Sequence, residues 1–291
     1  MNLRWLVPCS LLASTVVSAA SSSVRADDWP QWLGPQRDSV WREDGIIERI
    51  PAAGLPVKWR VPVSLGYAGP SVADARGYVP DFVVEEGQVQ NSPSGRNELR
   101  GRERLLCLDA ATGKQLWQDA YPVTYRVSYA GGPRVTPTVA DGKVYTLGAE
   151  GHLRCLDATS GKLLWSRDFK ADYGAETPIW GFSAHPLVVG NLLYVLAGGE
   201  GSVCVALNKQ TGEEVWRALS APEPGYCPPT LIEHAGRKQL VIWHPEAINS
   251  LNPENGQVYW SLPNQAGYRM SIHAPRKLGN HLYTSATANA S

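Results

Sequence analysis

The chain has 291 residues, and its 27 Lys and Arg balance 27 Asp and Glu, so the formal net charge is zero. With 43% hydrophobic and 19% charged residues, 28 Gly and 22 Pro, the composition is typical of a globular protein with many short strands and turns, and it excludes an intrinsically disordered chain. The balanced charge provides no strong attraction to nucleic acid or anionic lipid, so we expect no nucleic-acid partner.

Residues 1–26 have the features of a secretory signal peptide. Arg4 precedes a short apolar stretch, and small residues lead to a candidate cleavage site after Ala26. We therefore expect a periplasmic or secreted protein with no transmembrane segment in the mature chain. Residues 27–56 follow as an N-terminal extension, and residues 57–291 as a repeat region.

Four copies of one ten-residue phrase organise the repeat region; they begin at Leu108, Leu156, Leu207 and Leu251. Each copy has Leu at its first position, Asp or Asn at its second, Gly at its sixth and Trp at its tenth. The successive Trp residues are 48, 51 and 44 positions apart. This period is typical of a β-propeller blade of about four strands.

Each position of the phrase has a physical reason. The second position calls for a short side-chain oxygen that caps the amides of a tight turn: Asp109, Asp157, Asn208 and Asn252. The sixth position calls for a residue that accepts a positive φ: Gly113, Gly161, Gly212 and Gly256. The tenth position is expected to pack between neighbouring blades rather than to stack on a ligand: Trp117, Trp165, Trp216 and Trp260.

Turn signals such as Asp141-Gly142 between apolar runs complete four strands per unit, and no segment has a sustained helical period. The sequence thus predicts an all-β propeller of four-stranded blades with almost no helix. In the longer first unit we predict a mobile surface loop from Glu85 to Arg104. Trp59 is expected to end an isolated fourth strand. The cysteines after the leader are predicted to be buried thiols at small-residue positions: Cys107, Cys155, Cys204 and Cys227.

A second set of residues precedes the first strand of every unit. A proline stands there each time: Pro70, Pro137, Pro186, Pro229 and Pro275. The first strand of a blade lies nearest the propeller axis, so aromatic and cationic residues just before it would surround one mouth of the central channel. These are the candidate ligand-binding residues: Tyr67, Arg126, Arg134, Trp180, Phe182, His185, Tyr226, Tyr268, Arg269 and His273. Packing between repeats is the alternative. No catalytic and no metal-binding residue is predicted.

The phrase, with its Asp, Thr-Gly and Trp, resembles the repeat of the pyrroloquinoline-quinone-like (PQQ-like) β-propellers. That superfamily includes quinoprotein alcohol dehydrogenases and BamB-type outer-membrane assembly factors. The resemblance runs from Pro56 to Ser291, and the opening DDWPQWLGP, Asp27 to Pro35, is similar to exported PQQ-like repeat proteins of planctomycete-type bacteria. It implies an eight-bladed propeller, of which residues 57–291 would supply four to five blades and would be incomplete at the C-terminus.

Three functions remain open. In quinoprotein dehydrogenases the resemblance implies a quinone stacked on a disulfide of two adjacent cysteines, beside Ca²⁺ held by Glu, Asn and Asp. No two cysteines are adjacent in this sequence, so we expect no cofactor; PQQ and Ca²⁺ belong to the alternative of a quinone-dependent oxidoreductase. The favoured function is a non-catalytic binding or scaffold module of the cell envelope, whose partner is an envelope protein or a small-molecule ligand. The third is a carbohydrate-binding or small-molecule-binding propeller.

Overall fold

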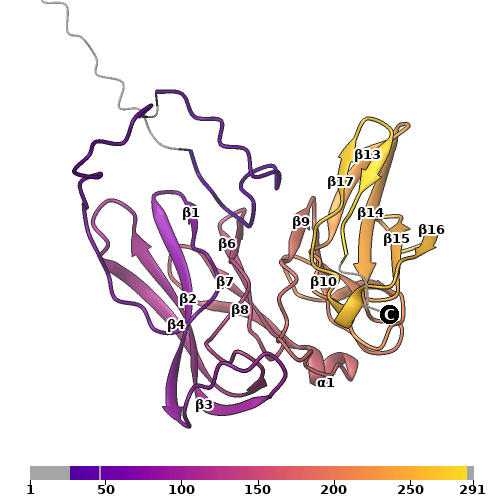
Figure 1. The fold of residues 1–291 in the computed structure, drawn as a ribbon, viewed down its shortest axis with the longest axis horizontal. Coiled ribbons are helices and arrows are strands. Elements are labelled where there is room, and N and C mark those ends of the chain that lie inside the picture. The colour runs from indigo at the N-terminus through magenta and orange to yellow at the C-terminus, as the bar shows by residue number, and fades with distance from the viewer. Residues whose placement is uncertain (1–26, 46, 287–291) are drawn as a thin grey trace, which may run out of the picture.

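The computed structural model describes residues 27–45 and 47–286, so the predicted signal peptide, residues 1–26, lies outside the described residues. Four antiparallel four-stranded sheets and one two-stranded sheet follow one another along the chain. Figure 1 shows them side by side, with β1–β4 on the left and β13–β17 on the right. The first strands of the first three sheets are neighbours, because β1 contacts β5 and β5 contacts β9. The predicted all-β architecture of four-stranded blades is confirmed.

Within each sheet the strands pair in sequence order. The first sheet contains β1 (Ser71–Ala73), β2 (Arg76–Glu86), β3 (Asn97–Asp109) and β4 (Gln115–Val127). The second contains β5 (Thr138–Ala140), β6 (Lys143–Leu147), β7 (His152–Asp157) and β8 (Leu163–Asp168). The third contains β9 (Leu187–Val189), β10 (Leu192–Leu196), β11 (Cys204–Asn208) and β12 (Glu214–Ala218). The fourth contains β13 (Thr230–His234), β14 (Arg237–His244), β15 (Ala247–Leu251) and β16 (Val258–Pro263), and the last β17 (Arg276–Leu278) and β18 (His281–Tyr283). Every first strand begins one residue after its proline.

The repeated phrase forms the turn between the third and fourth strands of each sheet. Asp109 Oδ1 accepts hydrogen bonds from the amides of Ala111 and Thr112, at 3.2 and 2.8 Å. Asp157, Asn208 and Asn252 accept from the amides that follow them in the same way. The four glycines have φ between 73° and 75°, a conformation that only glycine adopts without a Cβ penalty. The predicted roles of these two positions are confirmed.

The tryptophans of the first three phrases reach the turn of the next sheet. Trp260 of the fourth phrase does not, because its Nε1 donates to Gln239 Oε1 of its own sheet at 3.1 Å and its side chain is 37% exposed. A Cβ on Gly161 would lie 2.6 Å from the Trp117 ring, and Gly212 and Gly256 face Trp165 and Trp216 at the same distance. The Trp117 Nε1 donates to the carbonyl of Ala158, the residue after the capping Asp, at 3.2 Å. Trp165 and Trp216 donate to the carbonyls of Lys209 and Pro253, which hold the equivalent position. These tryptophans therefore couple neighbouring sheets.

Trp59 makes the same contact with the first sheet. Its ring lies 2.7 Å from where a Gly113 Cβ would stand, and its Nε1 donates to the Ala110 carbonyl at 3.1 Å. Residues 57–64 form no strand, however, so the predicted fourth strand ending at Trp59 is wrong. No described strand pairs with the backbone around Trp59. The residue is positioned by its ring contact with Gly113 and by the indole hydrogen bond to Ala110.

The first sheet also departs from expectation. Glu85 and Glu86 end β2, and residues 97–104 belong to β3, so only residues 87–96 form a loop where a loop from Glu85 to Arg104 was predicted. Along β3, exposed or half-buried arginines alternate with the buried Leu99, Gly101 and Glu103. This alternation is that of a half-buried strand, and an ion pair of Arg104 with Asp81 supports its outer face at 2.6 Å.

Helix is nearly absent from the described residues. α1 (Phe169–Tyr173) is a single turn, capped by Asp168 at its start and by Gly174 at its end, and Gly267–Arg269 form a 3₁₀ turn. No helix in the described part of the chain is long and apolar enough to span a membrane. The core lies between the sheets, and the cysteines Cys107, Cys155, Cys204 and Cys227 are free and buried, as predicted.

Candidate functional site: the mouth pocket

Residues that precede the first strands of all five sheets converge on one open pocket of about 290 Å³. We call it the mouth pocket; its lining residues are Tyr67, Tyr129, Arg134, Trp180, Ser183, Tyr226, Met270 and Ile272. The rings of Trp180 and Tyr226 are tilted by 52°, with centroids 5.7 Å apart. Four aromatic rings and two aliphatic side chains make its walls apolar, with one cation among them.

That cation, Arg134, is fully engaged by the protein backbone. Its Nε donates to the Trp180 carbonyl at 2.9 Å, and its two terminal nitrogens donate to the carbonyls of Gly132, Ser128 and Tyr129. Its guanidinium carbon lies 5.2 Å from the centroid of the Tyr67 ring. Burial lowers the pKa of Arg134. The guanidinium thus links three segments of the wall instead of presenting free donors to a ligand.

The loop that carries Trp180 is held from the first sheet. The Trp180 Nε1 donates to the Pro93 carbonyl at 3.1 Å, and the Ser128 amide donates to the Ile179 carbonyl at 2.7 Å. Arg96 bridges the Arg126 and Thr177 carbonyls, at 2.7 and 3.0 Å. The loop between β2 and β3 therefore has a defined place against the pocket, because its backbone carbonyls and Arg96 position the neighbouring loop.

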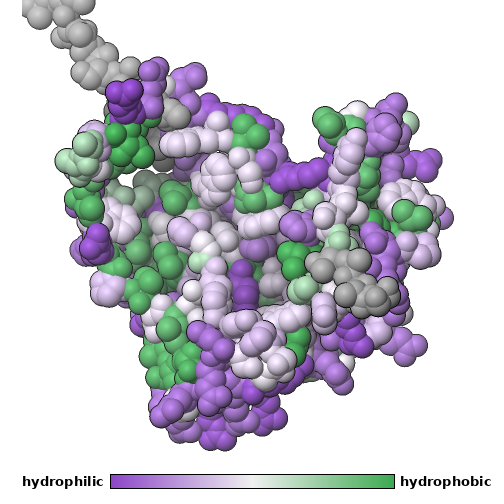
Figure 2. Space-filling view, viewed as in Figure 1, coloured by the Kyte–Doolittle hydropathy of each residue, from purple (hydrophilic) through white to green (hydrophobic). Residues whose placement is uncertain are grey.

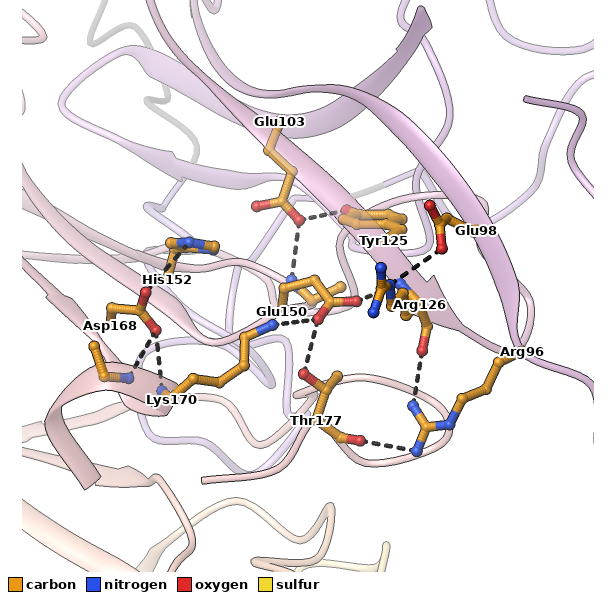
Figure 3. Close-up of polar contacts among 12 residues, drawn as sticks. Arg96, Glu98, Glu103, Tyr125, Arg126, Glu150, His152, Asp168, Lys170 and Thr177 are labelled. Atoms are coloured by element: carbon orange, nitrogen blue, oxygen red, sulfur yellow. Dashed lines mark hydrogen bonds and ion pairs between the residues drawn. The ribbon is translucent and has the colours of Figure 1, made fainter. Parts of the chain in front are cut away.

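Two buried carboxylates fix this arrangement. Figure 3 shows Glu150, which is only 1% exposed, at the centre of the network. Its carboxylate accepts from the Arg126 amide at 2.6 Å, from Lys170 Nζ at 2.6 Å and from Thr177 Oγ1 at 2.8 Å. Since these donors belong to β4, to α1 and to the Trp180 loop, one charge joins three elements.

Glu103 has the same role closer to the core. Its carboxylate accepts from the Ala149 amide at 3.0 Å and from the hydroxyls of Tyr121 and Tyr125, as Figure 3 shows for Tyr125. Burial, and then the Glu103 charge, raise the pKa of Tyr125 well above its usual value, so this hydroxyl remains a donor. The carboxylates of Glu103 and Glu150 both accept hydrogen bonds from several donors of the protein. Their role is therefore structural.

The Tyr226 hydroxyl is a buried polar group in the wall of the pocket. Tyr226 is 6% exposed, and its hydroxyl makes no hydrogen bond within the described residues. Burial raises the pKa of this hydroxyl, so it stays protonated at neutral pH and keeps its O–H as a donor. An unsatisfied buried hydroxyl costs about 1–3 kcal/mol, a cost that a ligand acceptor would remove.

Four of the predicted binding residues meet in the pocket: Tyr67, Arg134, Trp180 and Tyr226. Phe182 does not, because it is 2% exposed and packs edge-on against Phe169 in the core between the second and third sheets. Tyr268 is turned outward by its φ of 54° and is 72% exposed. An aromatic residue directly follows a glycine before four of the first strands: Tyr67, Phe182, Tyr226 and Tyr268. Only Tyr67 and Tyr226 line the pocket.

The remaining predicted residues lie elsewhere. Arg126 pairs with Glu98 at 3.2 Å and Arg269 with Glu223 at 2.9 Å. His185 is buried and stacks on Trp32, while His273 lines a different cavity of about 420 Å³ together with Trp32. The histidines thus belong to the axial side of the sheets.

Sequence reasoning missed four lining residues: Tyr129, Ser183, Met270 and Ile272. Ser183 and Ile272 each lie three residues before a shared proline, Pro186 and Pro275. Their equivalent positions could therefore have indicated them from the sequence. Tyr129 lies in the turn after β4 with a φ of 48°, and it has no counterpart in the other repeats that could have revealed it.

The described residues do not fit the quinone site that the superfamily implies. The four free cysteines lie in three different sheets and before β13, so no two can form the adjacent disulfide. Burial raises the pKa of Cys107 to about 11 and that of Cys155 to about 12. No three His, Cys, Asp or Glu side chains in the described ranges are grouped to hold a metal ion.

Comparison with solved structures shows the fold. The structure of BamB from Moraxella catarrhalis is 16% identical, with a TM-score of 0.51 over 77% of this chain and 71% of that chain. The quinohemoprotein alcohol dehydrogenase from Comamonas testosteroni is 17% identical, with a TM-score of 0.55 over 90% of this chain and 46% of that chain. A comparison with curated proteins found no match.

A family model described as outer membrane protein assembly factor BamB matches residues 101–286. This range includes all four copies of the phrase and all five sheets in part or whole. The chain therefore belongs to the family of this model, the BamB family of PQQ-like repeat proteins.

Proposed function

We propose that this protein is an exported, non-catalytic binding module of the cell envelope, and that the mouth pocket receives an aromatic side chain of a partner protein. The observation that carries the proposal is the pocket wall: aromatic rings from three separate repeats, Tyr67, Trp180 and Tyr226, surround an open volume of about 290 Å³. Aromatic pairs contribute about 0.5–1.5 kcal/mol beyond their buried area, so such a wall favours a ring over an aliphatic chain.

The chemistry of the lining supports binding rather than turnover. No Asp, Glu, His or Cys is among the eight lining residues, and these are the side chains that most often move protons or attack a substrate. Arg134 has its donors bound to backbone carbonyls. The Tyr226 hydroxyl remains to orient a ligand acceptor, such as the backbone carbonyl beside a bound aromatic residue.

Location in the envelope is supported by two observations. Residues 1–26 have the composition of a secretory leader. The family model that matches the chain is described as outer membrane protein assembly factor BamB. An exported propeller with an apolar mouth meets its partners outside the cytoplasm. We therefore expect the partner to be an envelope protein with an accessible aromatic residue.

A photo-crosslinking experiment tests this proposal in cells. Tyr67 and Tyr283 are equally exposed, at 53% and 54%, but only Tyr67 lines the mouth pocket. Each is replaced in turn by p-benzoylphenylalanine, and adducts are identified by mass spectrometry. We expect a discrete envelope-protein adduct from position 67, which Trp180→Ala abolishes, and none from position 283. Equal adducts from both positions, or adducts that survive Trp180→Ala, would contradict the proposal.

Carbohydrate is the second candidate ligand, because sugar rings also stack on aromatic faces and the free Tyr226 hydroxyl could bond a sugar hydroxyl. Calorimetric titration of the purified protein with N-acetyltryptophanamide and with methyl glycosides separates the two. Saturable binding of the amide that Trp180→Ala removes supports the aromatic partner. Saturable binding of a glycoside alone assigns the pocket to sugars.

A further inference from the structure

A different site lies on the axial side of the sheets, away from the lining described above. The segment from Asp27 to Ser39, here the axial segment, crosses the free edges of the first strands. The backbone of Trp29 pairs with Val72 of β1 through two hydrogen bonds, of 2.8 and 2.9 Å. The next residue, Pro30, accepts from the Val139 amide of β5 at 2.8 Å. The axial segment thus begins as a short added strand.

Arg37 continues these contacts onto the third and fourth sheets. Its Nη1 donates to the Pro186 carbonyl at 3.0 Å, and its Nη2 lies 3.5 Å from the carbonyls of His185 and Pro229. Its own carbonyl accepts from Arg276 of β17 at 2.7 Å. One half-buried residue thus joins three sheets, and the axial segment as a whole contacts all five.

Aromatic contacts add to these hydrogen bonds. The ring of Trp32 stacks on His185, with centroids 4.8 Å apart and planes tilted by 21°. The Arg37 guanidinium also lies against this indole, 5.6 Å from the Trp32 centroid. Beside them, an open cavity of about 460 Å³ separates the axial segment from β9, β13 and β17.

The backbone of the axial segment has a conformation that these contacts impose. Leu33, Arg37 and Ser39 have φ of 63°, 53° and 61°, which costs a non-glycine residue about 1–2 kcal/mol. Gly34 has φ of 80°, and a Cβ there would lie 2.8 Å from the Trp29 ring. A free peptide would avoid this shape, so binding to the sheet edges must favour it.

The chain that joins the axial segment to the propeller makes few contacts. Residues 47–60 are exposed and form no helix or strand, and Trp41 and Ile50 are 60% and 65% exposed. Figure 2 shows hydrophobic surface at the upper left, where Figure 1 draws the indigo N-terminal chain. The axial segment is therefore held by its own contacts and not by its connection.

We propose that the free edges of the first strands form a peptide-binding groove, and that the groove recognises a segment with the pattern of two tryptophans followed by an arginine, extended at its start and folded into turns from Trp32 to Arg37. The axial segment is its occupant within the same chain. Two of its contacts, Trp29 with Val72 and Pro30 with Val139, are backbone pairings at strand edges, as in β-strand addition. Its arginine, Arg37, donates to three carbonyls at or beside the shared prolines. A peptide of this sequence supplied separately competes for the groove.

The test uses the full, folded chain. A specific protease site is placed between Gly45 and Pro51, the protein is cleaved after folding, and the fragments are separated by size exclusion under native conditions. We expect the N-terminal fragment to remain bound. A labelled synthetic peptide of Asp27–Ser39 is then added in excess, and its exchange with the bound fragment is followed by anisotropy.

Peptide variants supply the controls, and they avoid any effect on folding. Arg37→Ala should weaken competition by at least tenfold, since charged hydrogen bonds are the stronger ones, and Gly34→Ala should do so independently through its backbone. Gln36→Ala, at an exposed position, should compete like the parent peptide. Immediate loss of the cleaved fragment, or equal competition by all three variants, would overturn the proposal.

Discussion

The mouth pocket and the axial groove are built from neighbouring residues, yet they differ in what covers them. In the groove, the donors of Arg37 meet carbonyls beside the sheets, and the His185 ring is covered by Trp32, although His185 Nδ1 has no hydrogen-bond partner within the described residues. In the mouth pocket, the aromatic faces surround a volume that no described segment fills. The groove is thus occupied by the chain itself, whereas the pocket is open. Stability should depend on the groove, and binding on the pocket.

Arg37→Ala should produce the largest loss of stability. It removes the charged side-chain hydrogen bonds to the carbonyls before the third and fourth sheets, so we expect the free energy of unfolding to fall by about 3 kcal/mol. Chemical denaturation measures the change. Arg42→Ala, at an exposed ion pair with Asp38, is the matched control and should change it by less than about 0.5 kcal/mol. Equal losses in Arg37→Ala and Arg42→Ala would show that the groove contributes no more to stability than an exposed ion pair.

His185 should make stability depend on pH. Burial, with the Arg37 charge acting the same way, lowers its pKa from 6.5 to about 3. Between these values the unfolded chain binds a proton that the folded chain does not, so stability falls as pH falls, by up to about 1.4 kcal/mol per unit. The difference between the wild type and His185→Gln should therefore shrink by about 1.6 kcal/mol from pH 6.5 to 5.

The control for that measurement is His234→Gln, since His234 is exposed on β13. Its difference from the wild type should stay constant over the same pH interval. A parallel pH dependence of the His185→Gln variant and the wild type would show that the groove admits the protonated ring.

Glu150→Gln should reduce both the stability of the fold and the affinity of the mouth pocket moderately. The amide cannot accept from all three donors at once, so we expect a loss of about 1–2 kcal/mol in the free energy of unfolding. Because Glu150 holds the loop that carries Trp180, affinity at the mouth pocket should fall as well. Glu86→Gln, at an exposed ion pair, is the control and should change neither stability nor affinity. An unchanged affinity in Glu150→Gln would show that the Glu150 hydrogen bonds do not influence binding at the mouth pocket.

Tyr226→Phe should slightly stabilise the fold and clearly weaken binding. It removes a buried hydroxyl that has no partner within the described residues, so the free energy of unfolding should not fall and should rise by about 1 kcal/mol. Loss of one donor to the ligand should weaken affinity about tenfold. Calorimetry on both proteins measures this, and an unchanged affinity would exclude the hydroxyl from recognition.

The turns could be predicted because their chemistry is local. A side chain such as Asp109 bonds amides two and three residues away, so a short phrase contains the whole interaction. The long third strand of the first sheet could not, since its buried face includes Glu103, a charged residue that suggests a loop when its partners are unknown. Those partners, Tyr121, Tyr125 and Ala149, lie 18 to 46 residues further along.

The candidate site was predicted only partially for the same reason. Repeat equivalence placed Tyr67 and Tyr226 correctly because both precede a first strand in the same way. It failed for Tyr268, where a 3₁₀ turn reverses the backbone, and it could not reveal the axial segment. Arg37 meets carbonyls 148 to 192 residues away, and no periodicity connects a single arginine with backbone atoms at that distance.

The tryptophan contacts make the joints between the first four sheets directional. At each of these joints a ring on one sheet meets a glycine turn on the next, and the indole N–H donates to the carbonyl that follows the capping residue. A ring cannot meet a ring at such a joint, so two copies related by a two-fold axis cannot share it. A further unit of the same phrase can, which means that duplication of one blade would create a new joint without disturbing the old ones.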